Sequence, residues 1–143
     1  MAGRQTGDGL ESDPQVLRWR LDSSAAAVGH MRRELGVALD RCGMSDDAHE
    51  MVLLVAYELA ANAVEHVGGP VEVVTTLSAG SVRIEVSDGS PEAPLLRPRD
   101  PLALRGRGLQ VVDGLASRWS WNAEDTGKTV WAEVLTDRPS DRV

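Results

Sequence analysis

A short stretch of the chain, residues 51–67, places polar side chains that could do chemistry close to one another. Glu58 and Asn62 are four residues apart, and Glu65 and His66 follow one turn later. Side chains at positions i and i+4 are neighbours on one side of a helix, so a carboxylate and a carboxamide would stand together. Such a pair offers oxygen atoms and a proton acceptor in one place, as cation binding or general-base chemistry requires.

The rest of this stretch indicates that the polar pair opens into a cleft. Met51, Leu54 and Val55 lie one and two turns earlier on the polar side, and a helix that is apolar all round should be buried there. Glu58 and Asn62 would then emerge from a covered region, although a solvated polar stripe also explains this helix taken alone. At about 100° per residue, the opposite face is apolar and consists of Leu53, Ala56, Tyr57, Ala60, Ala63, Val64 and Val67.

Two later segments carry further features of interest. Residues 82–90, VRIEVSDGS, alternate as a strand does and end in Asp88-Gly89, which taken alone would be a plain turn. Residues 106–109, Gly-Arg-Gly-Leu, open a second helical pattern, and the first amides of a helix can bind an anion. A dinucleotide-binding Rossmann motif needs a strand directly before its glycines, but prolines occupy that stretch here.

These three features occur in an order that resembles the GHKL-type (Bergerat fold) ATPase family, which includes gyrase, Hsp90, histidine kinases and MutL. The similarity is greatest to its serine-kinase branch, the bacterial anti-sigma factors of the RsbW/SpoIIAB kind. The order of a polar helix face, an Asp-Gly after a strand and a Gly-x-Gly at a helix start is much more specific than any one of them. The resemblance extends over about residues 14–136.

The resemblance implies roles for the helix residues. The family's first box, Glu-Leu-x-x-Asn-Ala-x-x-His, is matched by residues 58–66. This match implies that Asn62 is the Mg²⁺ ligand and that Glu58 is the general base toward a serine hydroxyl. His66 matches a commonly occupied position near the nucleotide, although capping of this helix end is an equally good role. The implied cofactors are ATP and Mg²⁺.

The resemblance assigns the remaining nucleotide contacts to the later segments. Asp88 is similar to the family's adenine reader, whose carboxylate accepts the exocyclic amine, and Gly89 lets the chain turn after the strand. The usual Asp-x-Gly-x-Gly is shortened here to Asp-Gly-Ser-Pro. Residues 127–130, Gly-Lys-Thr-Val, resemble the closing box and imply that the Thr129 hydroxyl lies near the adenine. The implied phosphate contacts are Arg105, Gly106, Arg107, Gly108 and Leu109.

The hydrophobic pattern predicts the elements that position these residues. Strands are expected over 16–21, 71–77, 82–90, 118–121 and 129–135, with a turn over 122–128. Helices are expected over 25–41, from an N-cap at Ser45 to His66, and over 108–116. This order predicts an α/β two-layer sandwich with helices on one face of a mixed, mostly antiparallel sheet.

Length and composition indicate one domain with a single core, because the chain has 143 residues and is 42% hydrophobic. We expect a flexible lead-in over residues 1–13, the ATP-binding domain over 14–136 and a C-terminal tail over 137–143. Cys42 is the only cysteine, so no intramolecular disulfide or multi-cysteine metal site can form. Lys128 is the only lysine, which indicates the codon usage of a GC-rich bacterium more than chemistry.

Charge and hydropathy exclude two classes of partner. The net charge of −7 and the pI of about 4.9 leave no basic surface that could hold nucleic acid by neutralising phosphates. No apolar run approaches the roughly 20 residues of a membrane span, and the N-terminus has no secretory pattern. We therefore expect a cytoplasmic protein without a membrane or direct nucleic-acid partner.

The resemblance implies an anti-sigma factor serine/threonine-protein kinase. Such a protein sequesters a sigma factor, phosphorylates an anti-anti-sigma (STAS-domain) protein in a partner-switching circuit, and acts as a homodimer. The alternative is a non-catalytic binding module of the same fold that docks a regulatory protein without phosphotransfer. A detached ATPase portion of another family member is disfavoured, because the sequence holds no transducer or dimerisation segment.

Residues 90–105 predict a measurable response to nucleotide. They contain four prolines and three arginines, which prevent a regular element, and they stand where the family keeps its ATP lid. We expect a mobile lid that becomes ordered when nucleotide binds. Limited proteolysis should cut after Arg97 or Arg99 in the apo protein and should slow when ATP is added. Equal cutting rates in both states would contradict the lid.

Overall fold

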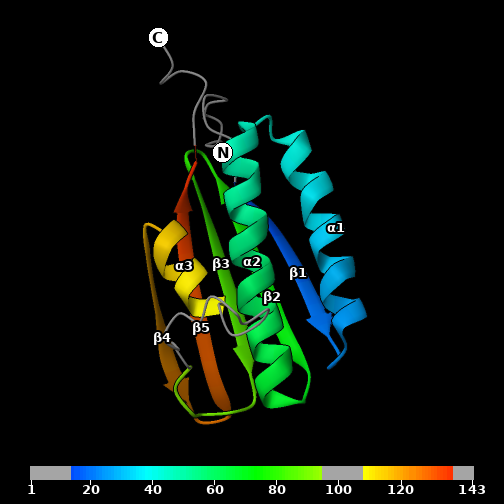
Figure 1. The fold of residues 1–143 in the computed structure, drawn as a ribbon, viewed down its shortest axis with the longest axis vertical. Coiled ribbons are helices and arrows are strands. Elements are labelled where there is room, and N and C mark those ends of the chain that lie inside the picture. Colours follow the sequence, from blue (N-terminus) through cyan, green and yellow to red (C-terminus); the bar gives the residue numbers. More distant parts are fainter. Residues whose placement is uncertain (1–13, 95–107, 137–143) are drawn as a thin grey trace, which may run out of the picture.

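Three helices cover one face of a five-stranded sheet in the part of the chain that the computed structural model describes, residues 14–94 and 108–136 (Figure 1). The chain order of the elements is the one that the hydrophobic pattern predicts, and the two-layer α/β architecture is confirmed. The elements are β1 (Gln15–Leu21), α1 (Ala25–Arg41), α2 (Asp46–Val67), β2 (Val71–Ser78), β3 (Ser81–Asp88), α3 (Gly108–Leu115), β4 (Arg118–Glu124) and β5 (Gly127–Leu135).

The sheet has the order β1-β2-β3-β5-β4, and every neighbouring pair of its strands is antiparallel. The expectation of a mixed sheet is therefore wrong in this detail. Two helices lie between β1 and β2, so the chain reverses an odd number of times and β2 runs against β1. The pairs β2–β3 and β4–β5 are hairpins, which are antiparallel by construction.

The last hairpin is longer than predicted. The sequence pattern ends the first of its strands at Trp121, whereas β4 continues to Glu124 and only residues 125–126 form the turn. Polar residues extend the ladder because β4 is an edge strand whose outer positions tolerate exposure, and Asn122 pairs with Thr129 and Ala123 with Lys128. The turn is therefore only two residues long, and Glu124 pairs with Gly127 beside it.

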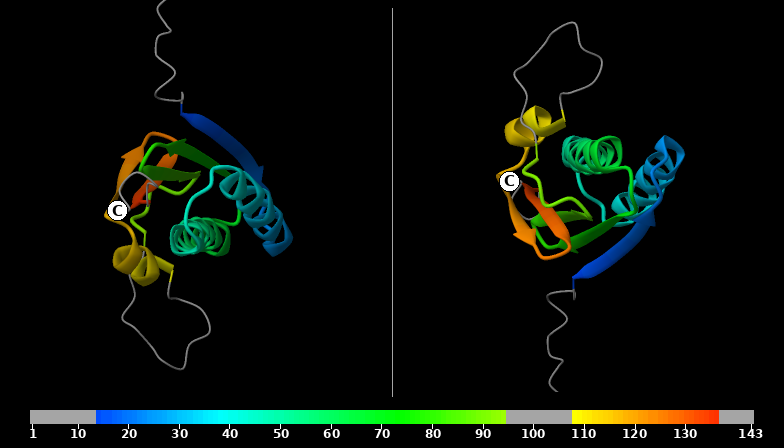
Figure 2. Two further views of the ribbon diagram at one scale, coloured as in Figure 1. Left: turned by 90° about the horizontal axis from the view of Figure 1, so that it is seen from above. Right: turned by 90° about the horizontal axis from the view of Figure 1, so that it is seen from below.

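Helix α2 is the element against which the rest of the domain packs. The Ser45 hydroxyl caps its start by accepting the Ala48 N–H at 3.1 Å, and Gly68, with φ of 75°, ends it in the left-handed conformation. In the two end-on views, α2 lies between α1 and α3 over the sheet (Figure 2). Its buried residues are Ala48, Val52, Val55, Ala56, Leu59, Ala60, Ala63 and Val64.

The inward face of α2 is turned from the predicted one. Leu53, Tyr57 and Val67 were expected in the core but are only half-buried. Two of them lie toward α1 instead: Leu53 is the nearest side chain to Gly36, and the Arg32 guanidinium lies 5.5 Å from the centre of the Tyr57 ring. A helix that packs against both a sheet and another helix buries a wider face than the single apolar face that a 3.6-residue repeat predicts.

The sheet face away from the helices carries charged and aromatic side chains. The Arg118 Nε donates to Glu133 Oε1 at 2.7 Å, and the Arg83 Nη1 donates to Glu133 Oε2 at 2.9 Å. The hydrogen bond from Arg118 is the main cause that lowers the pKa of the Glu133 carboxyl, and it raises the pKa of Arg118 in turn. The Arg83 guanidinium also lies over Trp131, 4.3 Å from the ring centre. These contacts keep an open sheet face solvated.

One end of the domain gathers elements that are distant in the sequence. The last turns of α2, the end of β3 and the start of β5 lie together at the lower end in Figure 1. None of the helices in the described ranges combines the length and the apolar character that crossing a membrane requires.

Gly127 allows β5 to start against the end of β3. Its φ is 153°, and an added Cβ would overlap the carbonyl oxygen of Asp88 and approach the Gly89 Cα to 2.9 Å. Gly127→Ala should therefore lower the free energy of unfolding by roughly 2 kcal/mol or more, as measured by urea denaturation. Gly114→Ala in α3 is the matched control, because an added Cβ meets nothing within 4 Å and should leave stability equal or higher. Equal losses in the two variants would contradict this close approach.

Candidate functional site

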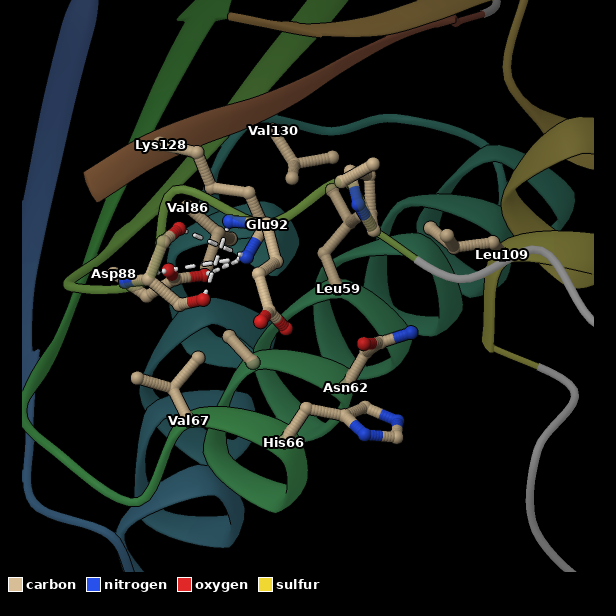
Figure 3. A pocket seen from close by; sticks show the side chains of 14 residues that line it. Leu59, Asn62, His66, Val67, Val86, Asp88, Glu92, Leu109, Lys128 and Val130 are labelled. Atoms are coloured by element: carbon tan, nitrogen blue, oxygen red, sulfur yellow. Dashed lines mark hydrogen bonds and ion pairs between the residues drawn. The ribbon is translucent and has the colours of Figure 1, made fainter. Parts of the chain in front are cut away.

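A pocket of about 130 Å³ lies where the last turns of α2 meet β3, α3 and β5 (Figure 3). Cavities of about 150 Å³ can hold a benzene ring, so this space suits a flat ring system. Its apolar walls are Leu59, Ala63, Val67, Val86, Leu109 and Val130, together with Ala93 and Pro94 after β3. Its polar lining residues are Asn62, His66, Asp88, Ser90, Glu92 and Lys128.

Strand alternation places Asp88 and Lys128 on the pocket side. The two residues are directly opposite one another in the β3–β5 ladder, and opposite residues of an antiparallel pair point to the same face. Val86 and Val130, two residues further into each strand, belong to the core. Asp88 and Lys128 therefore continue two core-facing rows to the strand ends, where the core gives way to the pocket.

Asp88 and Lys128 form a buried ion pair. The Lys128 Nζ lies 3.1 Å from both Oδ1 and Oδ2 of Asp88, and their side chains are only 8% and 1% exposed. The Ser90 N–H donates to Asp88 Oδ1 at 2.9 Å, and the Lys128 Nζ donates to the Ser90 carbonyl at 3.3 Å. A buried charge is costly unless it is paired and hydrogen-bonded, and both charges meet that condition here.

Helix α2 supplies the other side of the pocket. Asn62 and His66 are one turn apart and line it, and Figure 3 shows both projecting from α2 across from Asp88 and Lys128. Glu58 is half-buried one turn before Asn62 but is not a lining residue. The structure thus brings Asn62, His66 and Asp88 to one place and leaves Glu58 beside it.

The remaining predicted residues fall into three groups. Leu109 lines the pocket, and Gly108 is the first residue of α3. Gly89 follows β3 and lies against Gly127, as the close approach described above requires. The phosphate contacts expected from Arg105, Gly106 and Arg107 lie outside the described residues, so they stay predictions.

Thr129 is not among the residues that line the pocket, and the role expected for its hydroxyl near the adenine stays a prediction. Its Oγ1 lies 2.8 Å from the Ser87 Oγ and donates to Glu124 Oε2 at 3.2 Å. Ser87 is next to the inward Asp88 in β3, and Thr129 is next to the inward Lys128 in β5. Because neighbouring residues of a strand alternate in direction, Ser87 and Thr129 point to the opposite face of the sheet. Lys128 holds the inward position instead.

Sequence reasoning missed Lys128, Ser90 and Glu92 as pocket residues. A signal for Lys128 was present, because alternation counted back from Val130 places it inward. That Lys128 is the only lysine indicates codon usage and does not by itself predict a position in the pocket. Ser90 and Glu92 belong to an irregular stretch after β3, where no periodicity could have located them.

The polar side chains of the pocket suit a metal ion only if a bound ligand, such as a nucleotide phosphate, supplies further oxygen atoms to it. In residues 14–94 and 108–136, no group of three or more His, Cys, Asp or Glu side chains could hold a metal ion. Mg²⁺ in nucleotide sites is usually held by one or two protein groups and by substrate phosphates. The carboxamide oxygen of Asn62 fits one such protein ligand.

Comparisons with known proteins show the family and the fold of this chain. Residues 21–134 match the family model described as a histidine kinase-like ATPase domain (HATPase_c_2), a span that includes every residue lining the pocket. The chain is similar in fold to the crystal structure of the RsbU and RsbW domains of Rv1364c from Mycobacterium tuberculosis, with a TM-score of 0.67 and 22% identity. That match covers 90% of this chain and 34% of the other, so this chain spans about a third of its length. No curated protein matches the sequence.

The ion pair predicts an asymmetric effect of charge removal. Asp88→Asn keeps the side-chain shape but leaves the Lys128 ammonium buried without its counter-ion, which should cost about 3 to 5 kcal/mol of unfolding free energy. The double variant Asp88→Asn/Lys128→Met removes both charges and should recover much of the loss, as measured by urea denaturation. Glu72→Gln is the control, because it breaks an ion pair at the surface, in which the side chains of Arg20 and Glu72 are 69% and 59% exposed. Loss of this pair should cost below about 1 kcal/mol of unfolding free energy. A double variant less stable than Asp88→Asn would contradict the pairing.

Proposed function

We propose that this chain, which belongs to the histidine kinase-like ATPase domain family, is an anti-sigma factor serine/threonine-protein kinase that uses Mg-ATP. The observation that carries the proposal is the pocket between α2 and the ends of β3 and β5, with apolar walls and the buried carboxylate of Asp88 at its base. The apolar side chains suit the two faces of a purine ring, and the carboxylate suits its amine.

Asp88 would orient the base. Its Oδ2 accepts from Lys128 alone among the contacts described, whereas Oδ1 accepts from both Lys128 and the Ser90 N–H. A carboxylate oxygen can accept two hydrogen bonds, so Oδ2 keeps an acceptor position for an exocyclic amine. Val86 and Val130 would exclude water from that hydrogen bond, which strengthens it.

The polar face of α2 would serve the phosphate end. Asn62 would hold Mg²⁺ through its carboxamide oxygen, and the bound ion supplies neutralisation of the phosphate charge. Glu58, one turn before Asn62, would accept the proton of a serine hydroxyl on the partner protein. Glu58 is half-buried and does not line the pocket, so it would meet the protein substrate beside the nucleotide.

The family and the fold support a partner-switching role. The solved protein of similar fold carries an RsbU and an RsbW domain in one chain. We propose that this chain sequesters a sigma factor as a homodimer and phosphorylates an anti-anti-sigma (STAS-domain) protein. This circuit would operate in the cytoplasm.

A second candidate function has one observation in its favour. The Asp88 carboxylate already holds Lys128 through both oxygens, so the pocket is satisfied without a ligand. A binding-only protein of the same fold would dock its partner without phosphotransfer and would need no nucleotide at this site.

Two substitutions on α2 separate these candidates. Glu58→Gln removes the proton acceptor but keeps the shape, so transfer of labelled phosphate from ATP to the antagonist should fall about 10²- to 10⁴-fold with little change in ATP affinity. Asn62→Ala removes the metal ligand and should weaken Mg-ATP binding itself, as measured by calorimetry. Glu50→Gln, at an exposed position two turns before Glu58, is the control and should change neither quantity. ATP binding with no transfer by the unaltered protein would favour the binding-only candidate, and full transfer by Glu58→Gln would remove Glu58 as the base.

A further inference from the structure

Lys128 stands directly in front of the group that would recognise the base. Its Nζ is 3.1 Å from each oxygen of Asp88, and its third polar contact is the Ser90 carbonyl at 3.3 Å. An ammonium has three N–H donors, and two of these three acceptors belong to one carboxylate. A single N–H can serve that carboxylate, so another can turn toward a ligand in the pocket.

A carboxylate without such a neighbour selects strongly among purines. It accepts a hydrogen bond from the 6-amino group of adenine but repels the 6-oxo group of guanine or hypoxanthine, because two acceptors then face each other without a proton. An unmatched polar group buried in this way carries the full cost of its desolvation. Asp88, with its side chain 1% exposed, would impose this selection if it acted alone.

Lys128 changes that selection because it places a donor beside the acceptor. We propose that Lys128 is the specificity-determining residue of the pocket and that it admits 6-oxo purine nucleotides, such as ITP and GTP, as well as ATP. This inference rests on the proposed nucleotide site. The 6-amino group of adenine would donate to Asp88 Oδ2. A 6-oxo group would instead accept from the Lys128 Nζ, while the adjacent ring N–H donates to Asp88 Oδ2.

The chemistry of lysine suits a donor that must change partners. Its ammonium is a point charge on a flexible stem with rotatable N–H groups, whereas the guanidinium of arginine presents a planar fork that would engage both Asp88 oxygens at once. The Lys128 stem lies in a pocket that also contains Val86 and Val130, so its methylene groups are covered while its head stays beside Asp88.

Equilibrium binding of three nucleotides tests the inference. Calorimetry with Mg²⁺ and ATP, ITP or GTP should give dissociation constants within about tenfold of one another for the full chain. Lys128→Met should weaken ITP and GTP relative to ATP by about tenfold or more, since a hydrogen bond to a charged group is lost. ITP isolates the 6-position, because it lacks the 2-amino group of guanine. Arg20→Met is the matched control, since it removes one positive charge at an exposed strand end outside the pocket and should leave the ratios unchanged.

Each outcome bears on the inference in a defined way. A preference of the unaltered protein for ATP over ITP of more than about a hundredfold would overturn it, as would unchanged ratios in Lys128→Met. If Lys128→Met does not fold, the ATP-to-ITP ratio of the unaltered protein decides alone. Binding of ATP but not of ITP or GTP removes only the role of Lys128 and leaves the proposed function standing. Failure to bind any of the three nucleotides removes both.

Discussion

The burial of α2 between the sheet, α1 and α3 is the interaction on which the rest of the structure depends. Each fully buried Val or Leu of this helix contributes about 1.5 to 3 kcal/mol, and the alanines at 56, 60 and 63 are buried with them. The same helix continues beyond the core with Asn62 and His66. The pocket is thus an extension of the packing that folds the domain, and Asn62 and His66 stand on the helix that the core holds in place.

The pairing of β3 with β5 does the same for the opposite wall. Both strands bury their inward residues up to and including the last pair, in which Asp88 and Lys128 replace aliphatic side chains and keep the register. Gly127 permits this final pair by letting the backbones meet. A charged pair at the end of an apolar row thus marks the place where the core meets the pocket.

Local patterns in the sequence predict most of the fold, because strand alternation and helix caps are set by residues close in the chain. The row Val82, Ile84, Val86 and the cap at Ser45 illustrate this. The errors arise where a second element decides: packing against α1 as well as the sheet turns the inward face of α2, and the edge position of β4 lets polar residues extend its ladder to Glu124. Asp88 could be identified by its motif. The place of Glu92 in the pocket depends on the course of the irregular chain after β3, which no hydrophobic repeat predicts.

The ion pair also gives the chain an unusual surface chemistry. Lys128 is its only lysine, and the side chain is 8% exposed, so no ε-amino group is available to solvent. Reagents that acylate amines would therefore reach the Lys128 amine only when its contacts with Asp88 and Ser90 break. The rate at which Lys128 is acylated, which mass spectrometry measures without any label in the protein, would therefore report how often its contact with Asp88 breaks.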